Sequence, residues 1–576
     1  MSAREEIVVV GAGPTGLTLA CQLLRRGVGC RLVDSAPEAT QRSRAIGVSA
    51  RSLEVLAELG AADELVELGL PSRVANFYAG GRRIARLTAS AIEHTRYPFL
   101  LAVPQSETER VLERHLERLG GTVERGVALR ELRQEPGAQA VELTLDADGG
   151  AETVEASWVV GADGSHSAVR RGAGIEFKGE ATGNVFANVD AVLESPPAAG
   201  EGHYYFAAEG LLVIAPLPDD TYRVTALVDP AQADRPLTIE DVQGLVERRA
   251  DPAIRVRELR DAGWGIARVS IQTRTAERFR AGRCLLAGDA AHIYGPTGAQ
   301  GMNGGIQDAH NLAWKLALVA SGRAGEALLD SYDDERRPVA HEVLHSVEAQ
   351  TKLATIRSRP GGAARNALLR AVTRAGLLDR GLGPRIMQFD VSYRDAPGVA
   401  APTGGRLRNR DALTGRRLPD VPLEPGEGAA RTFDLVGAHG LTALVLGAGR
   451  AHRPHVERLA AALGERHGEL VALRLVAPAA APGAAGEPAA VDRHGALHGA
   501  LGIAEPTVLL VRPDAHVAYR GPLARPSEAL SHLDRVLGPP QALGPTTSSA
   551  GTSSSRRKSS NDRGGRPSER STPSRT

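Results

Sequence analysis

The stretch Ile7-Val8-Val9-Val10-Gly11-Ala12-Gly13-Pro14-Thr15-Gly16, followed by a segment to Arg26 with apolar residues on one helical face, decides the fold of this chain. The β-branched run predicts a buried strand, and the segment after Gly16 predicts a helix. Gly11 permits a tight turn, Gly13 lets the backbone approach a pyrophosphate, and Gly16 allows close helix packing. A second strand, Cys30 to Val33, ends at Asp34, which could bind a ribose. We therefore predict a dinucleotide-binding unit; a plain glycine turn in a parallel sheet is the alternative.

The size and charge of the chain exclude several kinds of protein. Its 576 residues require more than one domain, and its net formal charge of +1 includes a basic stretch from Gly551 onward. The rest of the chain has no basic surplus, so we expect no nucleic-acid partner. The three cysteines lack metal-type spacing, and we see neither a signal peptide nor an apolar run of membrane-spanning length. We expect a soluble, cytoplasmic protein that binds no metal and no membrane.

Two segments after Asp34 carry polar residues that are candidates for ligand contacts. Arg42 and Arg44 could meet a phosphate or stack on a ring, although a solvated basic loop is an equal alternative. Farther on, Ser106 and Glu109 have the spacing of an N-cap and a capping box for a helix that runs to Leu119. Capping leaves Gln105 unexplained.

Two later glycine-containing turns repeat the pattern of a strand that ends in a loop. Asp163-Gly164 follows the apolar run Trp158-Val159-Val160, and Gly288-Asp289 follows Cys284-Leu285-Leu286. A glycine-dense loop to Gly305 comes next, and we predict a helix from Gln307 to about Val319. Its N–H groups and dipole would suit a pyrophosphate or a ring that becomes anionic on reduction. Between these turns, residues 177–268 contain long strand-like runs, which predict a separate antiparallel sheet that carries the substrate.

In combination and order, these motifs resemble the single-component FAD-dependent aromatic hydroxylases, the class A flavin monooxygenases. The resemblance covers roughly Ile7 to Pro338 and includes a Pro-x-Gly-x-x-Gly-x-Asn element from Pro296 to Asn303. It implies that FAD is the cofactor and that NAD(P)H binds transiently as reductant. The family's acid after the second strand is usually Glu, so the shorter Asp34 is a departure. The residues that it assigns to FAD are Gly11, Gly13, Pro14, Gly16, Asp34, Arg42, Arg44, Gln105, Asp163, Gly288, Asp289, Pro296, Gly298, Gly301, Met302 and Asn303.

The resemblance also implies a fold class and a division into domains. The fold class is α/β, with a discontinuous Rossmann-like FAD domain of the glutathione-reductase type, an inserted antiparallel substrate sheet and a C-terminal thioredoxin-like domain. The FAD domain would comprise residues 1–75, 104–176 and 269–345, and the substrate domain 76–103 and 177–268. A helical connector at 346–402, a thioredoxin-like domain without redox cysteines at 403–540 and a disordered tail at 541–576 would follow. We assign the C-terminal domain to packing or to subunit association, for example in a homodimer.

The activity that the resemblance implies is monooxygenation of an aromatic substrate with O2, through a flavin C4a-hydroperoxide. The polyketide branch of the family suggests a polycyclic phenol. Candidate substrate contacts are Phe206, Leu211, Val213, Tyr222 and Pro296. His292 and Tyr294 are candidates for assisting deprotonation, with simple packing as the favoured alternative. Baeyer–Villiger oxidation or epoxidation would share every motif, whereas a non-catalytic dinucleotide-binding regulator would need only the first one. The cofactor preference between NADH and NADPH, the regiochemistry and any covalent flavin link stay open.

Overall fold

The protein is built on a mixed eight-stranded sheet that contains the first strand of the sequence. The computed structural model describes residues 4–40, 45–229, 237–260, 267–295, 298–356, 358–399, 413–425, 430–478 and 486–538. The strand order is β18-β19-β11-β1-β2-β8, and β10 and β9 extend it beside β11. The strands from β19 to β8 are parallel to their neighbours. The bounds are β1 Arg4–Val10, β2 Arg31–Asp34, β8 Val123–Arg125, β9 Ala128–Arg133, β10 Val141–Ala147, β11 Gly150–Gly161, β18 Arg280–Ala281 and β19 Cys284–Leu286.

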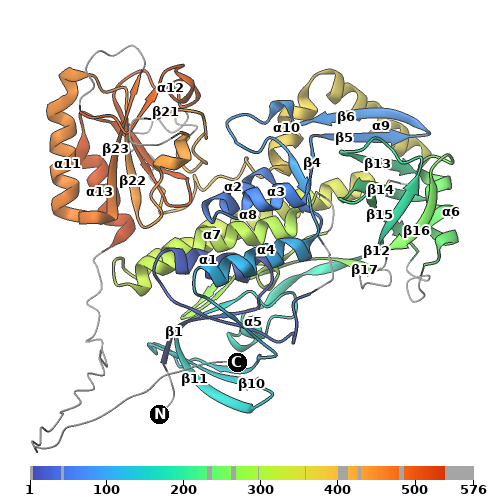
Figure 1. The fold of residues 1–576 in the computed structure, drawn as a ribbon, viewed down its shortest axis with the longest axis horizontal. Coiled ribbons are helices and arrows are strands. Elements are labelled where there is room, and N and C mark those ends of the chain that lie inside the picture. Colours follow the sequence, from blue (N-terminus) through green and yellow to red (C-terminus); the bar gives the residue numbers. More distant parts are fainter. Residues whose placement is uncertain are drawn as a thin grey trace, which may run out of the picture. The chain divides into compact units, whose positions relative to one another are not determined.

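Helices α1 (Pro14–Arg25), α4 (Gln105–Arg118), α7 (Gln300–Ala320) and α8 (Ala327–Ala354) pack together beside this sheet (Figure 1). Helix α7 begins at Gln300 rather than at the predicted Gln307, so residues 300–305, which the sequence predicts as the end of a loop, are helical. The reason is tertiary packing, because a methyl group on Gly305 would lie only 2.1 Å from the hydroxyl oxygen of Thr15 in α1. The helix needs glycine at this contact in spite of its poor helix propensity.

The start of α4 also differs from the sequence-based prediction. The helix begins at Gln105 with Pro104 as its N-cap residue, and no side chain caps it. Glu109 is only 5% exposed, and its carboxylate accepts a hydrogen bond from the Gln105 side chain at 2.8 Å. The predicted capping box of Ser106 and Glu109 is therefore wrong. By contrast, α2 (Ala50–Glu58) has Ser49 as its N-cap, and α3 (Ala62–Leu68) follows it.

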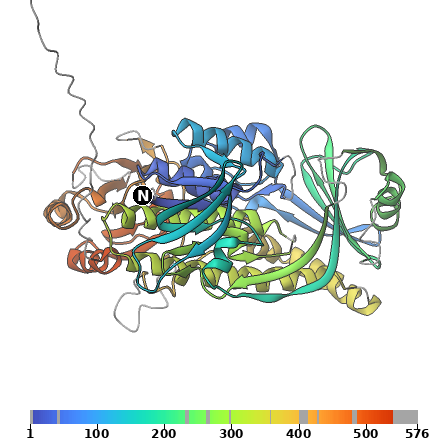
Figure 2. The same ribbon diagram turned by 90° about the horizontal axis from the view of Figure 1, so that it is seen from below.

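A second, nine-stranded sheet is formed mainly by the segment that was expected to carry the substrate. Its order is β20-β17-β12-β15-β14-β13-β5-β6, with β16 beside β12. The sheet is mixed rather than antiparallel, since β13 and β5 run parallel. The long strands β12 and β17 belong to this sheet and run side by side as an antiparallel pair (Figure 2). The bounds are β5 Val74–Ala79, β6 Arg82–Thr88, β12 Phe177–Glu194, β13 Glu201–Ala207, β14 Gly210–Pro216, β15 Thr221–Val228, β16 Arg255–Arg260, β17 Ala267–Ala276 and β20 His292–Ile293.

Helices cover both faces of the second sheet. Helix α6 (Ile239–Arg249) packs on one face, while the end of α8 and helices α9 (Arg359–Arg374) and α10 (Leu377–Ile386) lie on the other side. A small sheet of β3 (Gly47–Val48), β7 (Leu100–Ala102) and β4 (Leu70–Ser72) joins the two regions, and α5 (Ala168–Gly172) follows β11.

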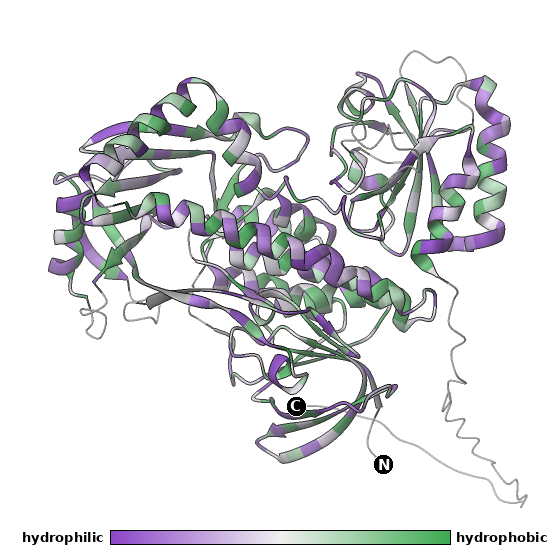
Figure 3. Ribbon diagram, turned by 180° about the vertical axis from the view of Figure 1, so that it is seen from behind, coloured by the Kyte–Doolittle hydropathy of each residue, from purple (hydrophilic) through white to green (hydrophobic). Residues whose placement is uncertain are grey.

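The C-terminal region forms a third sheet with the order β21-β24-β23-β22-β25-β26. Strands β22, β23 and β24 are parallel, whereas β25 and β26 are antiparallel additions. The strands are hydrophobic and the outer helix α11 carries many hydrophilic residues (Figure 3). The bounds are β21 Glu424–Pro425, β22 Leu441–Leu446, β23 Val471–Pro478, β24 Ala490–Asp492, β25 Thr507–Val511, β26 Val517–Pro522, α11 Arg453–His467, α12 Ala496–Ala500 and α13 Pro526–Leu537.

Within the ranges given above, no helix combines the length and the apolar run that a bilayer crossing requires. The predicted disorder of residues 541–576 falls outside the described residues.

Candidate cofactor and substrate site

The polar and glycine motifs of the sequence meet at one edge of the first sheet. Asp34 ends β2, and Gly11, Asp163 and Gly288 follow the carboxyl ends of β1, β11 and β19. These four strands are consecutive neighbours in the sheet. In open α/β sheets, ligands bind outside the carboxyl ends of the strands. Four segments from distant parts of the chain are therefore placed around one candidate ligand site.

The first glycine turn is closely packed on one side and open on the other. Gly11 has a φ of +103°, and a methyl group there would lie 2.4 Å from the carbonyl oxygen of Ala162, just before Asp163. A methyl group on Gly16 would lie 1.9 Å from the Gly11 oxygen, whereas one on Gly13 would meet nothing within 4 Å. Gly11 and Gly16 are thus required by packing, and Gly13 faces open space where a phosphate could approach.

The Asp34 carboxylate is held by the backbone. Its oxygens accept hydrogen bonds from the N–H groups of Ala12 at 2.6 Å and Ala36 at 2.8 Å. Each carboxylate oxygen can accept a second bond. The short side chain therefore stays close to the glycine turn and keeps some capacity for a ribose hydroxyl.

Asp163 and Asp289 lie in different surroundings. One Asp163 oxygen accepts bonds from the N–H groups of Ala168 and Val169, so this residue caps α5. Asp289 is exposed, and a methyl group on Gly301 would lie 4.0 Å from one of its oxygens. Asp289 is thus placed beside the N-terminal turn of α7.

Asn303 fixes the first turn of α7 to the rest of the site. Its side chain accepts a hydrogen bond from Ser49 N at 2.8 Å and donates to the oxygens of Gly47 and Ala299 at 2.8 and 2.7 Å. It is 1% exposed, so it positions the helix rather than facing open space. Gly298 and Met302 lie partly exposed at the same turn. Arg42, Arg44 and Pro296 lie outside the described residues.

A buried charge cluster, which sequence reasoning missed, supports the Gly288 loop. Asp308 is fully buried and accepts hydrogen bonds from Gly288 N at 3.0 Å, from Arg336 Nε at 2.6 Å and from His292 Nε2 at 2.6 Å. Burial alone would raise the pKa of Asp308, but the charge of Arg336 and the hydrogen bond with His292 hold it below its ordinary value. A signal was available, because the predicted helix carries Asp308 and Lys315 between apolar residues, and a charge inside a buried helix requires a buried partner.

The two candidate proton-transfer residues lie beside this cluster, and Tyr294 is partly exposed. His292 is 1% exposed and its ring stacks on Tyr294 with 4.8 Å between the centroids. Burial raises the pKa of Tyr294 well above its usual range, so its phenol stays protonated at neutral pH. These surroundings favour the alternative that His292 and Tyr294 pack in the structure over a role for them in substrate deprotonation.

Glu109 and Gln105 lie near the Asp34 side of the site. Gln105 also accepts a hydrogen bond from Ala45 N at 3.2 Å, so its side chain links the segment before β3 to α4. Burial raises the pKa of Glu109 to about 7, although the hydrogen bond from Gln105 acts in the opposite direction and lowers this pKa. Near neutral pH this carboxyl is therefore partly protonated.

The candidate substrate residues divide between the two faces of the second sheet. Phe206, Leu211 and Val213 share one apolar cluster with Phe186 and Leu227. We call these five residues the α8-side face, because Ala354 of α8 packs against them. Phe206 and Val213 are only partly buried there. Tyr222 belongs to the cluster on the opposite face, which also includes Val242 and Val246 of α6. The structure therefore does not bring Tyr222 together with the other candidates.

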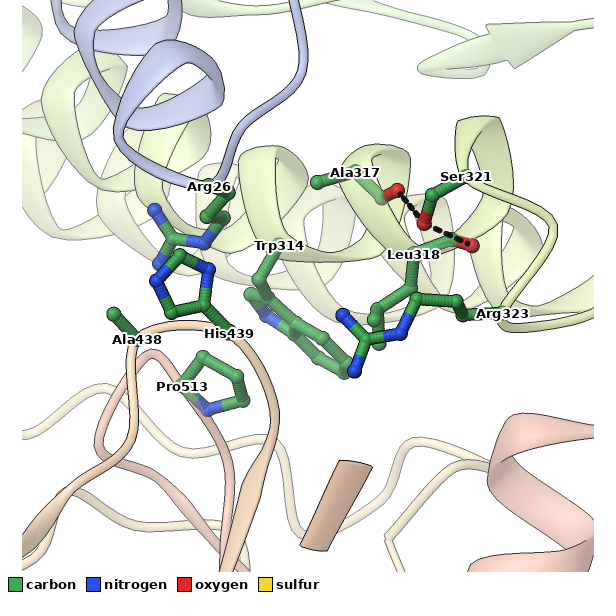
Figure 4. A pocket seen from close by; sticks show the side chains of 9 residues that line it. All are labelled: Arg26, Trp314, Ala317, Leu318, Ser321, Arg323, Ala438, His439 and Pro513. Atoms are coloured by element: carbon green, nitrogen blue, oxygen red, sulfur yellow. Dashed lines mark hydrogen bonds between the residues drawn. The ribbon is translucent and has the colours of Figure 1, made fainter. Parts of the chain in front are cut away.

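Two hollows of the surface lie away from the motif edge. Figure 4 shows a cavity of about 20 Å³ where Pro513 and His439 approach Trp314 of α7, which is room for about one water molecule. A larger hollow of about 670 Å³ lies at the starts of β1, β2 and β8, the edge of the sheet opposite the motif loops.

Beside the small cavity, buried ion pairs join the C-terminal region to the helices under the site. Arg512 donates to both oxygens of Glu335 at 2.6 and 2.7 Å, and Lys315 Nζ donates to Glu335 at 2.8 Å. Asp514 accepts from Arg512 and from Trp314 Nε1. All these residues are nearly inaccessible to solvent.

Comparison with known proteins agrees with this geometry. A family model described as an FAD binding domain matches residues 4–347, and one described as the C-terminal region of aromatic-ring hydroxylases matches residues 411–540. The chain belongs to the FAD-dependent aromatic-ring hydroxylases. It is a mixed α/β FAD-dependent monooxygenase, with NAD(P)H and O2 as co-substrates. Membership in this hydroxylase family argues against the alternative that the chain is a non-catalytic dinucleotide-binding regulator.

Relatives of known activity span nearly the whole hydroxylase chain. It is 34% identical to 6-methylpretetramide 4-monooxygenase of Streptomyces rimosus, with 90% of each chain covered. It is 33% identical to pentachlorophenol 4-monooxygenase of Sphingobium chlorophenolicum, over 93% of this chain and 97% of the relative. Among solved structures, the anhydrotetracycline hydroxylase OxyS of Streptomyces rimosus matches with a TM-score of 0.73 and 32% identity, over 93% of this chain and 100% of that chain.

Proposed function

We propose that the motif edge binds FAD through the residues that the sequence singled out. The open face of Gly13 and the N-terminus of α1 would receive the pyrophosphate, Asp34 the ribose, and Asp289 the ribityl chain. The observation that carries the proposal is the arrival of four motif loops at the ends of four adjacent parallel strands. Asn303 and Asp308 would act behind the cofactor by fixing the backbone that faces it.

In this arrangement the bound flavin supplies electron transfer from NAD(P)H and activation of O2. The protein's own part is positional and electrostatic. The first N–H groups of α7 have no partner within the helix, and their dipole favours negative charge at the flavin ring. The side chain of Asn303 holds that turn in place, and the neutral phenol of Tyr294 adds no charge beside it. The buried side chains behind this turn exclude water from that side of the site.

We propose that the substrate is a polycyclic phenol of the polyketide type, and that it lies against the α8-side face. Two observations support this. The relatives named for pretetramide and anhydrotetracycline act on compounds of that kind, and the α8-side face offers partly exposed apolar and aromatic side chains. The relative named for pentachlorophenol makes a simple phenol the second candidate. Baeyer–Villiger oxidation or epoxidation would use the same arrangement and would be recognised only by the product.

We further propose the domain division given above, with the third sheet as a thioredoxin-like domain. Three parallel strands flanked by antiparallel ones and by helices support this assignment. The chain has no cysteine after Cys284, so this domain would have no thiol chemistry. Its buried contacts to Glu335 support a role in packing.

The test begins with the purified protein loaded with FAD. NADPH consumption is measured with 1-naphthol, an anthrone and phenol, and the products are identified by mass. We expect faster NADPH oxidation and addition of one oxygen atom with the polycyclic compounds. A clear preference for phenol would refute the polycyclic assignment, and a ring-expanded ester would show Baeyer–Villiger chemistry.

A further inference from the structure

In the described part of the chain, one buried arginine donates neither to a carboxylate nor to a backbone carbonyl. Eight arginines there are less than 10% exposed. In seven of them the guanidinium donates to a carboxylate or to a backbone carbonyl. The eighth, Arg365 of α9, is 5% exposed and donates only to the side-chain oxygen of the adjacent Asn366 at 3.1 Å.

The guanidinium of Arg365 is therefore buried without a compensating charge. Its Nη1 atom is inaccessible and has no hydrogen-bond partner. Burial lowers the pKa of Arg365, which is the mark of a cation that has lost water and gained no anion. A buried charge without a partner is costly, so the position calls for an anionic ligand.

The surroundings of Arg365 connect it to the proposed substrate site. The guanidinium carbon lies 4.3 Å from the centre of the Phe206 ring, so the arginine stacks on a member of the α8-side face. This contact occupies the flat face of the guanidinium, and in the described structure only Asn366 accepts a hydrogen bond from its in-plane N–H donors. Arg365 is also the only described residue of α9 that is buried.

The α8-side face is in turn close to the proposed flavin loop. The side-chain oxygen of Gln350 in α8 lies 3.6 Å from the position of a methyl group on Gly298. Ala354, one helical turn later, packs against Leu211 and its neighbours. One turn is about 5.4 Å along the axis, so a ligand of several fused rings could reach from the loop to Arg365.

We propose that Arg365 is a specificity-determining residue that binds an anionic oxygen of the aromatic substrate. The oxygen would belong to a phenolate, an enolate or a carboxylate at the end of the ring system away from the flavin. This inference rests on the proposed function, because it assumes that the α8-side face holds the substrate. It adds that the substrate is recognised by a charged oxygen as well as by apolar contact.

The test compares two probes on FAD-loaded enzyme, 3-hydroxy-2-naphthoate and the uncharged 2-naphthol at pH 7. Dissociation constants are measured from the change in flavin absorption, without turnover. In the natural protein we expect the carboxylate to bind more tightly. Arg365→Met, which keeps an apolar side chain over Phe206, should weaken binding of the carboxylate at least tenfold and change that of 2-naphthol less than twofold. Arg370→Met, at an exposed position of the same helix, is the matched control and should change neither constant.

The outcomes separate this inference from the proposal beneath it. Equal effects of Arg365→Met on both probes, or no effect on either, would show that Arg365 only packs on Phe206. If that variant does not retain FAD, the same two dissociation constants are measured on Arg365→Lys, which keeps the positive charge but loses the planar guanidinium with its paired N–H donors. It should weaken only the carboxylate, and equal weakening of both probes would refute the inference. If neither probe perturbs the flavin of the natural protein, the polycyclic-substrate proposal itself fails and this inference fails with it.

Discussion

Replacement of Asp308 by Asn tests whether the buried cluster under the Gly288 loop supports the cofactor site. The carboxylate is fully buried, and it is the only described anion that pairs with Arg336, itself 3% exposed. Removing one member of a buried ion pair costs about 3–5 kcal/mol, because the other charge is left without a partner. The new amide group must also face the N–H of Gly288, His292 or Arg336, which adds a donor where an acceptor is needed.

We therefore expect Asp308→Asn to lower the free energy of unfolding by at least about 3 kcal/mol and to release FAD. Urea denaturation followed by circular dichroism measures the first quantity, and the flavin content of the purified protein measures the second. The pKa of Asp308 is lowered in the folded protein. Its contribution to the free energy of unfolding is therefore present at a pH above the ordinary carboxylate pKa and is lost as the pH falls through the folded-state pKa. The difference between variant and natural protein should thus be fully present at pH 7.

Two further variants serve as controls for this prediction. Asp330→Asn removes a carboxylate that is 68% exposed and pairs with Arg280, so it should cost no more than about 1 kcal/mol. Asp308→Asn combined with Arg336→Met removes both charges and should recover part of the loss. If Asp308→Asn retained FAD and lost less than about 1 kcal/mol, the cluster would not support the site as reasoned here.

Three other predictions concern the cofactor side of the molecule. Gly11→Ala should prevent correct folding, since its methyl group would lie 2.4 Å from a backbone oxygen and its φ is +103°. Gly13→Ala should fold but bind FAD at least about tenfold more weakly. Equal flavin content in the two variants would contradict both expectations. Asp289→Ala should be purified largely without flavin, and a variant with full, tightly bound FAD would remove Asp289 from the ribityl chain. Glu109→Gln should stabilise the protein at pH 8.5 by up to about 3 kcal/mol and have no effect near pH 4.5. The pKa of Glu109 is raised from 4.5 to about 7 in the folded protein, so its contribution to stability is fully present only below 4.5 and is lost as the pH rises through 7. A difference in urea midpoints that does not change with pH would refute this prediction.

Local sequence was sufficient for the elements that local chemistry determines. The strand before Gly11, the turn and α1 follow from adjacent residues. Prediction failed where distant packing decides. The glycines of α7 predict a loop, but they lie within a helix, and at Gly305 only glycine fits against Thr15 of α1. Glu109 has the spacing of a capping residue and is instead buried beside Gln105.

The candidate site could be predicted only in its motif loops. Each loop has a local signature, and parallel pairing of the strands brings them to one edge. The assignment of Tyr222 depended on which face of β15 it occupies, and this is fixed by its pairing with Pro216 and Ala191 across the sheet. The partners of Asp308 and Arg365 are also set by contacts between distant helices and strands, which no local pattern contains.

The bidentate pair between Arg512 and Glu335 limits how this chain can be cut or recombined. Glu335 and Lys315 belong to the segment matched as FAD-binding, and Arg512 belongs to the C-terminal match. A shortened chain that ends before the third sheet would expose Glu335 and Lys315 and would lose the guanidinium that neutralises them. A hybrid that takes its C-terminal part from a relative should fold only if that part supplies an arginine at this position. The two matched regions are therefore expected to be inherited as a pair rather than exchanged independently.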